Sequence, residues 1–419
     1  MSKAETRMMQ ADEKGTLQVQ VYTSGQRRPV PDALVSISYT GDPGNPIEEL
    51  KTDGDGRTPE VELPAPPLEY SMEPEADQPY SEYTVRVAAQ GFAPLVIAGS
   101  ELLPGQISRQ QALLNRAAGE DQYRDIVIPA HTLFGNYPEK IPEDEIKPVT
   151  DSGEIVLSRV VVPEYVVVHD GAPTDPTAMD YYVRYKDYIK NVASSEIYAT
   201  WPEEALRANI LAIMSFTLNR VYTEWYRNQG YQFTITSSTA YDHKWIYGRN
   251  IFDSISRVVD EIFADYLSRP DVKQPILTQY CDGKRVSCPD WMSQWGSKEL
   301  ADQGYSTIQI LRNYYGQDLY INTAEEISGI PASWPGSNLD IGSSGSKVRQ
   351  IQEQLNAIAE VYSSIPVSHV DGIFSEATKE AVRAFQNVFG LPSSGIVDYP
   401  TWYKIQEIYV AVTRIAELQ

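Results

Sequence analysis

Hydrophobic and polar positions alternate along the first 130 residues with the period of a β-strand. In GTLQVQVYT, Leu17, Val19 and Val21 alternate with polar residues. RPVPDALVSISYT repeats the alternation after a proline turn, TDGDG supplies a turn, and YSEYTVRVAAQGF supplies a further strand. Alternation places every second side chain on one face of a sheet. Short strands separated by turn signals therefore predict an N-terminal β-sandwich over residues 14–130.

The pattern changes in the middle of the chain. Residues 131–158 are rich in proline and acidic residues and are predicted to be a linker. VVVPEYVVVHDG then predicts a buried strand, and helical spacing follows from Tyr181 to about Asn228, with further helices at 251–268 and 297–314. Thr200 and Glu203 are expected to form a capping box, with Pro202 in the first turn. The central unit, residues 159–326, is thus expected to be mixed α/β.

A second linker is predicted at residues 327–338, where proline, glycine and serine gather in GIPASWPGSN. Three apolar stripes with helical spacing follow it, and they predict a three-helix module over residues 339–416. The expected fold class is a multidomain α+β protein.

Glu196 interrupts an otherwise apolar helical stripe. Steps of three and four residues back from it reach Val192, Ile189 and Tyr185. A carboxylate on such a face loses hydration, which is costly. Burial also raises the pKa of a carboxyl and keeps it protonated near neutral pH, the state that a general acid needs. The alternative is a helix-end acid paired with Arg207 or with a backbone amide.

The charge balance limits the partners. The 419 residues include 35 basic and 57 acidic side chains, a formal net charge of −22. Nucleic acids and anionic membranes are therefore disfavoured as partners, whereas an uncharged polymer such as carbohydrate is compatible. No apolar run of 18 residues predicts a membrane span. The start, MSKAETRMMQADEKG, lacks the apolar segment of a secretory signal, so synthesis in the cytoplasm is expected.

Two outer segments resemble known families. PVPDALVSI, TDGDGR and YTVRVAAQGF resemble in order the carboxypeptidase-regulatory-like (transthyretin-like) sandwich, which implies docking to a spore or wall protein. LDIGSSGSKVRQIQEQLN and DGIFSEATKEAVRAFQNVFGLPSSGIVDYPTW resemble the peptidoglycan-binding-domain-1 family. This second resemblance implies a three-helix module that binds the cell wall. The chain has Ser375 where that family usually has glycine, and the serine is expected to cap the next helix.

The central unit resembles the stage II sporulation protein D (SpoIID/LytB) family in YKDYIKNVASSEIYATWPEEALRA and in WMSQWGSKELADQGYSTIQILRNYY. The resemblance implies a lytic transglycosylase that cleaves the MurNAc–GlcNAc strands of peptidoglycan, with Glu196 as the catalytic acid. His243, Ser293 and Gln294 are candidates to bind sugar hydroxyls or to support the acid. Trp291 and Trp295 offer aromatic faces to sugar rings, although tryptophan is also common in cores.

One departure leaves two functions open. Ahead of MSQ the family commonly has a G-H-G-x-G run, and this chain has VSCPD. The alternatives are an active lytic transglycosylase and a catalytically inactive peptidoglycan-binding spore or wall protein. In either case the protein is expected to act at the spore or cell wall. Cys281 and Cys288, separated by DGKRVS, are candidates for a local disulfide, for a zinc site with His243, or for free thiols. No cofactor is required by either function.

Overall fold

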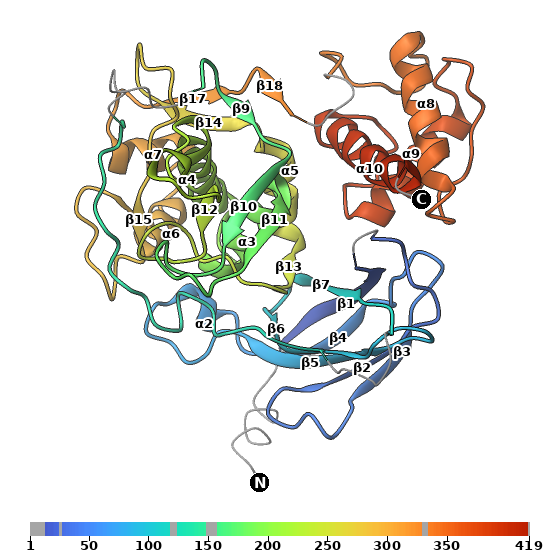
Figure 1. Ribbon diagram of the computed structural model, residues 1–419, viewed down its shortest axis with the longest axis horizontal. Coiled ribbons are helices and arrows are strands. Elements are labelled where there is room, and N and C mark those ends of the chain that lie inside the picture. The colour runs from blue at the N-terminus through green and yellow to red at the C-terminus, as the bar shows by residue number, and fades with distance from the viewer. Residues whose placement is uncertain (1–12, 25–26, 118–123, 148–156, 329–333, 418–419) are drawn as a thin grey trace.

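The computed structural model describes residues 13–24, 27–117, 124–147, 157–328 and 334–417. The chain is a multidomain mixed α/β protein, with a β-rich N-terminal unit, a central α/β unit and a C-terminal helical unit (Figure 1). Residues 1–12, on which most of the prediction about a secretory signal depends, lie outside the described residues. So do the linker stretches 148–156 and 329–333.

The N-terminal unit contains two sheets. Their strand orders are β3-β2-β5-β6-β8 and β13-β7-β1-β4. Inward side chains of both sheets, such as Val19, Ile37 and Val85, belong to one buried cluster, as the alternating pattern predicts. The elements are β1 (Glu13–Thr23), β2 (Leu34–Tyr39), β3 (Glu48–Lys51), β4 (Val61–Ala65), α2 (Glu69–Met72), β5 (Ser81–Ala88), β6 (Leu95–Leu102), β7 (Ile107–Leu114) and β8 (Arg124–Val127).

The central unit is built around α4, which is buried along nearly its whole length. Helices α3, α5, α6 and α7 and strand β14 all pack on it. The elements are β9 (Val161–Val162), β10 (Tyr165–His169), β11 (Asp180–Arg184), α3 (Tyr185–Glu196), α4 (Glu203–Tyr222), η1 (Arg227–Gln229), β12 (Ile235–Thr236), β13 (Ile251–Phe252), α5 (Asp253–Ile262), β14 (Asp265–Ser268), β15 (Tyr280–Cys281), β16 (Met292–Ser293), α6 (Gln294–Asp302), α7 (Thr307–Tyr315), β17 (Tyr320–Thr323) and β18 (Glu326–Ile327).

The predicted capping box of α4 is wrong. The helix begins at Glu203 after Pro202, and no side chain caps it. Thr200 instead donates a hydrogen bond from its hydroxyl to Ser71 Oγ at 2.8 Å. Pro202 occupies the N-cap position, and its ring restricts the backbone there. The Thr200 hydroxyl is therefore not used as a cap and contacts the N-terminal unit.

The first two units share a sheet. Strand β13 belongs to the central unit by sequence but pairs antiparallel with β7 of the N-terminal unit. Residues 251–268, predicted as one helix, therefore divide into β13, α5 and β14. Residues 131–147, within the predicted first linker, pack closely on the central unit. Ile141 N donates to Ala240 O at 2.8 Å, and Leu277 N donates to Glu145 O at 2.8 Å.

The C-terminal unit consists of three helices, as predicted from its apolar stripes. They are α8 (Ser346–Ala359), α9 (Glu376–Phe389) and α10 (Tyr399–Glu417). Leu355, Phe385 and Trp402 are fully buried in their common core. Ser375 caps α9 by accepting a hydrogen bond from Thr378 N, which confirms the role expected for this serine. None of the helices in the described part of the chain is both long and apolar enough to span a bilayer.

Candidate functional site

Glu196 is the last residue of α3, and its side chain is fully buried. Its Oε1 accepts a hydrogen bond from Lys244 N at 2.6 Å, and its Oε2 accepts one from the hydroxyl of Tyr280. Arg207, the alternative partner considered from the sequence, instead pairs with Glu203 and Glu261. The helical phase therefore located Glu196 correctly on the inner face, and a backbone amide is one of its partners.

Burial raises the pKa of the Glu196 carboxyl above its usual value. The nearby positive charge of Lys140 and the hydrogen bonds from Tyr280 and Lys244 N act in the opposite direction. The carboxyl is thus desolvated but retains two donors that favour its charged form. Burial therefore favours the protonated carboxyl, and these contacts limit how far its pKa rises.

Lys140 reaches this region from the segment predicted to be a linker. Its ammonium is buried, donates to Asp242 O, and lies 4.8 Å from the centroid of the Tyr280 ring. Burial lowers the pKa of Lys140, and the charges of Glu196 and Asp242 raise it. A lysine and a glutamate that are both shielded from water stabilise each other's charged forms.

His243 is fully buried beside the acid and does not lie on a surface that a sugar can touch in this conformation. Its Nδ1 is hydrogen-bonded to the Tyr188 hydroxyl at 3.0 Å, and its ring lies 5.8 Å from that of Tyr280 at an interplanar angle of 12°. Burial lowers the pKa of His243 well below its usual value, and Lys140 and Arg220 lower it further. A neutral imidazole therefore packs behind Tyr280.

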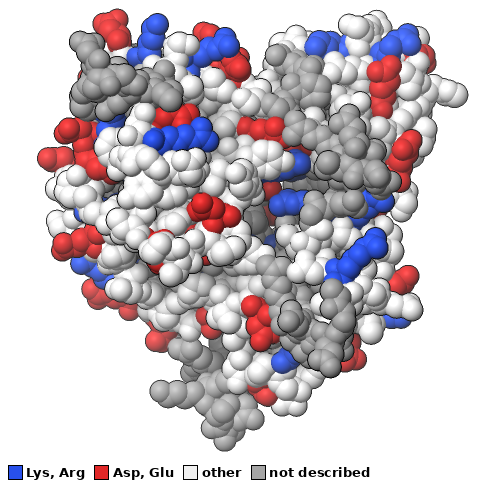
Figure 2. Space-filling model, in the orientation of Figure 1, with Lys and Arg blue, Asp and Glu red and all other residues white. Residues whose placement is uncertain are grey.

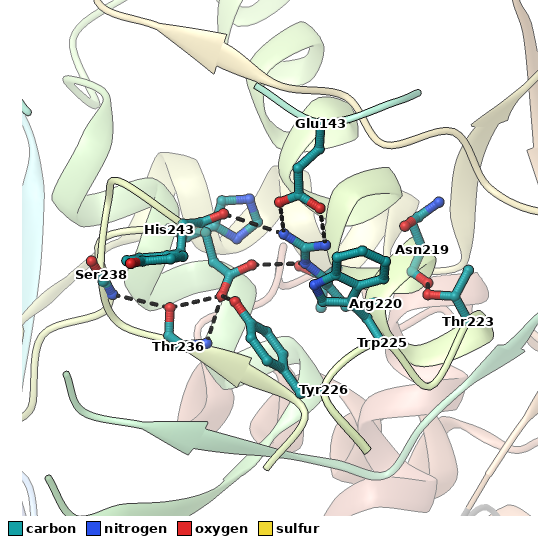
Figure 3. Close-up of polar contacts among 12 residues, drawn as sticks. Glu143, Asn219, Arg220, Thr223, Trp225, Tyr226, Thr236, Ser238 and His243 are labelled. Atoms are coloured by element: carbon teal, nitrogen blue, oxygen red, sulfur yellow. Dashed lines mark hydrogen bonds and ion pairs between the residues drawn. The ribbon is translucent and has the colours of Figure 1, made fainter. Parts of the chain in front are cut away.

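The guanidinium of Arg220 is the centre of a buried polar network (Figure 3). It is fully buried, donates twice to Glu143 at 2.9 and 2.6 Å, and donates to Asp242 Oδ1 at 2.8 Å. The other Asp242 oxygen accepts from the Tyr226 hydroxyl at 2.7 Å and from Thr236. This network fixes residues 242–244, and thereby holds the Lys244 amide against Glu196.

The MSQ motif braces the acid through the main chain. Gln294 is fully buried and donates from Nε2 to the Glu196 carbonyl oxygen at 3.1 Å. Ser293 accepts from Gly296 N and caps α6. Trp295 is buried against Trp201, with ring centroids 5.0 Å apart, so it belongs to the core. Trp291 lies on the loop before β16 and is partly exposed. Of the two tryptophans predicted to contact sugar rings, it is therefore the one at the surface.

Cys281 and Cys288 form a disulfide, with their Cα atoms 5.6 Å apart. It closes the loop that follows Tyr280, directly beside the strand pair β15 and β16. Paired sulfurs are not thiolates, so these cysteines do not fit the zinc site considered with His243. Among the described residues, no three histidine, cysteine, aspartate or glutamate side chains gather as a metal site.

Two residues of this cluster carry no local sequence signal. Tyr280 is separated from Glu196 by 84 residues, and Lys140 lies in an acidic, proline-rich run. Both are recognised only after folding brings them to the end of α3. As the side chains stand, the carboxylate is dry, and a polysaccharide can reach it only if Tyr280 or residues 243–245 move.

Comparisons with known proteins identify two domains. Residues 178–261 match the stage II sporulation protein family, and residues 344–405 match the peptidoglycan binding domain family. The chain therefore contains both domains. The first match includes Glu196 and His243, and the second covers α8, α9 and the beginning of α10.

Several individual proteins are similar over parts of the chain. A zinc D-Ala-D-Ala carboxypeptidase of Streptomyces albus G is 37% identical over 76 residues, which are 18% of this chain and 28% of that protein. The chain thus spans little more than a quarter of this curated relative. The N-terminal domain of SleB is 30% identical over 17% of this chain and 93% of its own, with a TM-score of 0.16. The 5-hydroxyisourate hydrolase of Klebsiella pneumoniae is 16% identical over 25% of this chain and 92% of its own, with a TM-score of 0.17.

Proposed function

We propose that this chain, which carries a stage II sporulation protein domain and a peptidoglycan-binding domain, is a peptidoglycan-binding protein of the spore or cell wall. The observation that carries the proposal is the match of residues 344–405 to the peptidoglycan binding domain family. The helices of this domain share a buried core, which supports a complete wall-binding unit. The net charge of −22 disfavours nucleic acid as a competing partner.

The closed environment of Glu196 favours binding over cleavage. Both carboxylate oxygens are occupied, one by Lys244 N and one by Tyr280. A general acid must come within hydrogen-bond reach of the glycosidic oxygen, and the fully buried carboxyl of Glu196 is not within reach of a sugar in this conformation. In this proposal the central domain holds a glycan strand without cutting it.

The second candidate function is a lytic transglycosylase, which the raised pKa of Glu196 favours. In this reaction a protonated Glu196 would give its proton to the glycosidic oxygen as the bond to MurNAc C1 breaks. The MurNAc 6-hydroxyl would then attack C1 and return its proton to the carboxylate, closing a 1,6-anhydro ring. One carboxylate suffices for this scheme, whereas hydrolases generally use two. The scheme requires Tyr280 to leave Oε2.

The N-terminal unit has a supporting role in either function. We infer that its two sheets form a carboxypeptidase-regulatory-like β-sandwich that docks the molecule to a spore or wall protein. The shared cluster of inward side chains supports a sandwich. Synthesis in the cytoplasm and action at the wall complete the proposal.

One experiment separates binding from cleavage. Wild type and Glu196→Gln are incubated with purified peptidoglycan sacculi and with glycan strands stripped of stem peptides. We expect both proteins to sediment with sacculi, and mass spectrometry to find no new anhydro-MurNAc ends. New ends from wild type alone would establish the transglycosylase, and failure of wild type to sediment would refute the binding function.

A further inference from the structure

A depression lies at the C-terminal end of α4, and Glu196 is not among the residues that line it. Four aromatic residues line it, and charged side chains of Arg220, Glu224 and Arg227 border it. The aromatic residues are Tyr165, Trp225, Tyr226 and Phe233. The candidate sugar-binding residues predicted from the sequence lie elsewhere.

The aromatic walls are held rigidly. Tyr226 and Phe233 are buried with ring centroids 4.8 Å apart, and Tyr231 packs 5.0 Å from Phe233. The indole of Trp225 lies beside Arg220 (Figure 3), with cationic groups of Arg220 and Lys147 at 5.2 and 4.3 Å from its ring. Rings that are already fixed lose little conformational entropy when a ligand packs on them.

Tyr165 provides an accessible ring. It is 38% exposed at the start of β10, whereas Tyr226 and Phe233 are buried. An exposed phenol ring beside a polar rim suits a ligand with an apolar face and polar edges. A pyranose is such a ligand, because its C–H groups form an apolar face and its hydroxyls project around the ring.

The rim supplies hydrogen-bonding groups of both signs. Glu224 and Arg227 form an ion pair at 3.3 Å, with side chains 18% and 53% exposed. Glu224 has a φ of +46°, a left-handed conformation that costs energy for a residue other than glycine. The carboxylate accepts and the guanidinium donates, so the pair matches vicinal hydroxyls, and its charges cancel. A neutral polyhydroxylated ligand therefore fits better than a polyanion or a polycation.

The pocket is continuous with the network behind Glu196. Arg220 and Tyr226 line the depression and also bind Asp242. We infer that this pocket is a second glycan-binding site, which takes an N-acetylated pyranose of the peptidoglycan strand. The identity of the polymer rests on the proposed function, whereas the site itself rests on the geometry of the central domain.

The test uses the full chain and a soluble GlcNAc–MurNAc tetrasaccharide free of stem peptide. Binding is followed by tryptophan fluorescence, and Trp225→Phe identifies the part of the signal that comes from the pocket. We expect a saturable change in wild type that is absent in Trp225→Phe. Tyr165→Ala should weaken binding about tenfold, the equivalent of about 1.4 kcal/mol.

The chain offers a matched control and a second variant. Tyr320 is 50% exposed and packs 5.9 Å from Arg312, much as Tyr165 packs 6.0 Å from Arg184. Tyr320→Ala should bind like wild type. Arg227→Ala tests the same pocket without touching a strand, and it should weaken binding at least threefold.

The outcomes separate this site from the proposed function. No fluorescence change that depends on Trp225, or equal affinities of Tyr165→Ala and Tyr320→Ala, would overturn the second site even if wild type sediments with sacculi. A signal that depends on Trp225 and is weakened by Tyr165→Ala supports the site. If such a protein failed to sediment, the proposed wall-binding function would fall while the sugar site stood.

Discussion

Glu196, the proposed acid of the second candidate function, accepts a hydrogen bond from the hydroxyl of Tyr280. A phenol that donates to a carboxylate favours its charged form, so this contact lowers the pKa of an acid that burial raises. The same hydroxyl also covers Oε2. Tyr280 therefore limits both the protonation and the accessibility of the acid, and substitution of this tyrosine tests both.

Tyr280→Phe should raise the pKa of Glu196 further, because it removes a donor to the charged form while the carboxyl stays buried. The carboxyl carbon of Glu196, followed by NMR against pH, reports the change. The raised pKa in the folded state also determines how stability changes with pH. Glu196 contributes most to stability below its unfolded pKa, and this contribution is lost as pH rises through the folded pKa.

Tyr188→Phe is the matched control for this prediction. Tyr188 is as buried as Tyr280, but its hydroxyl is bonded to His243 and not to Glu196. The control should leave the pKa of Glu196 as it is in wild type. Equal shifts in the two variants, or no shift in Tyr280→Phe, would show that the tyrosine contact does not control the acid.

The sequence predicts the position of Glu196 but not that of its partner Tyr280. The position of Glu196 follows from helical periodicity over Tyr185, Ile189 and Val192, which is a local property. Tyr280 and Lys140 reach the acid by tertiary folding, and no periodicity links them to α3. The burial of Trp295 and His243 is likewise set by packing partners that are distant in sequence.

At the scale of elements, the segment around β13 joins the first two units. Asn250 is fully buried ahead of this strand. Its Nδ2 donates to Glu101 O at 2.9 Å and to Ser108 Oγ at 2.7 Å, and its Oδ1 accepts from Glu101 N at 3.0 Å. One side chain thus satisfies both backbone groups of a residue in β6. The strand is only two residues long, so this contact is a main determinant of its position.

Asn250→Ala should destabilise the protein by about 3 kcal/mol, because it leaves buried backbone groups of Glu101 without this partner. Chemical denaturation measures the loss. Asn45→Ala is the control, since the side chain of Asn45 donates to the exposed carboxylate of Asp42, at 3.0 and 2.8 Å. The control should stay within about 0.5 kcal/mol of wild type. Similar losses in both variants would contradict a joining role for Asn250.

The elements show where sequence patterns succeed. Alternation predicted the inner faces of β1 and β5, and helical stripes predicted α8 to α10, because each pattern reports burial of one face. The short strand β13 has no such pattern, since two residues cannot display a period. Residues 131–147 look like a linker by composition, yet their proline-rich backbone follows the central unit and delivers Lys140 and Glu143.

At the scale of the whole molecule, charged side chains occupy the junction between α3 and α10. Basic side chains gather around the hollow that the N-terminal unit, the central unit and the C-terminal helices line together (Figure 2). Glu407 of α10 pairs with Lys186 at 3.0 Å and with Arg184 at 3.3 Å. Asp260 of α5 pairs with Lys186 and Lys190. The first turn of α3, the helix that ends at Glu196, therefore contacts the wall-binding domain.

Glu407→Gln should weaken this junction by about 3 kcal/mol, because it leaves largely buried cations without their anion. The wall-binding domain should then separate from the central unit, and small-angle scattering should record a larger radius of gyration. Glu203→Gln is the control, since its ion pairs with Arg207 and Arg257 lie at the surface. It should leave the radius unchanged.

Acid should open the same junction in wild type, in a pH range set by its carboxylates. The neighbouring cations hold the pKa of Glu407 well below its usual value, and that of Asp260 at about 2. Carboxyls with lowered pKa values contribute their full stability above their unfolded pKa values, and this is lost as pH falls through the folded ones. The radius should therefore be constant from pH 7 to about pH 5 and increase below about pH 4, whereas Glu407→Gln should already be expanded at pH 7. Expansion of wild type between pH 7 and 5 would instead assign the junction to groups that titrate near neutrality, and these ion pairs would not be what holds the wall-binding domain in place.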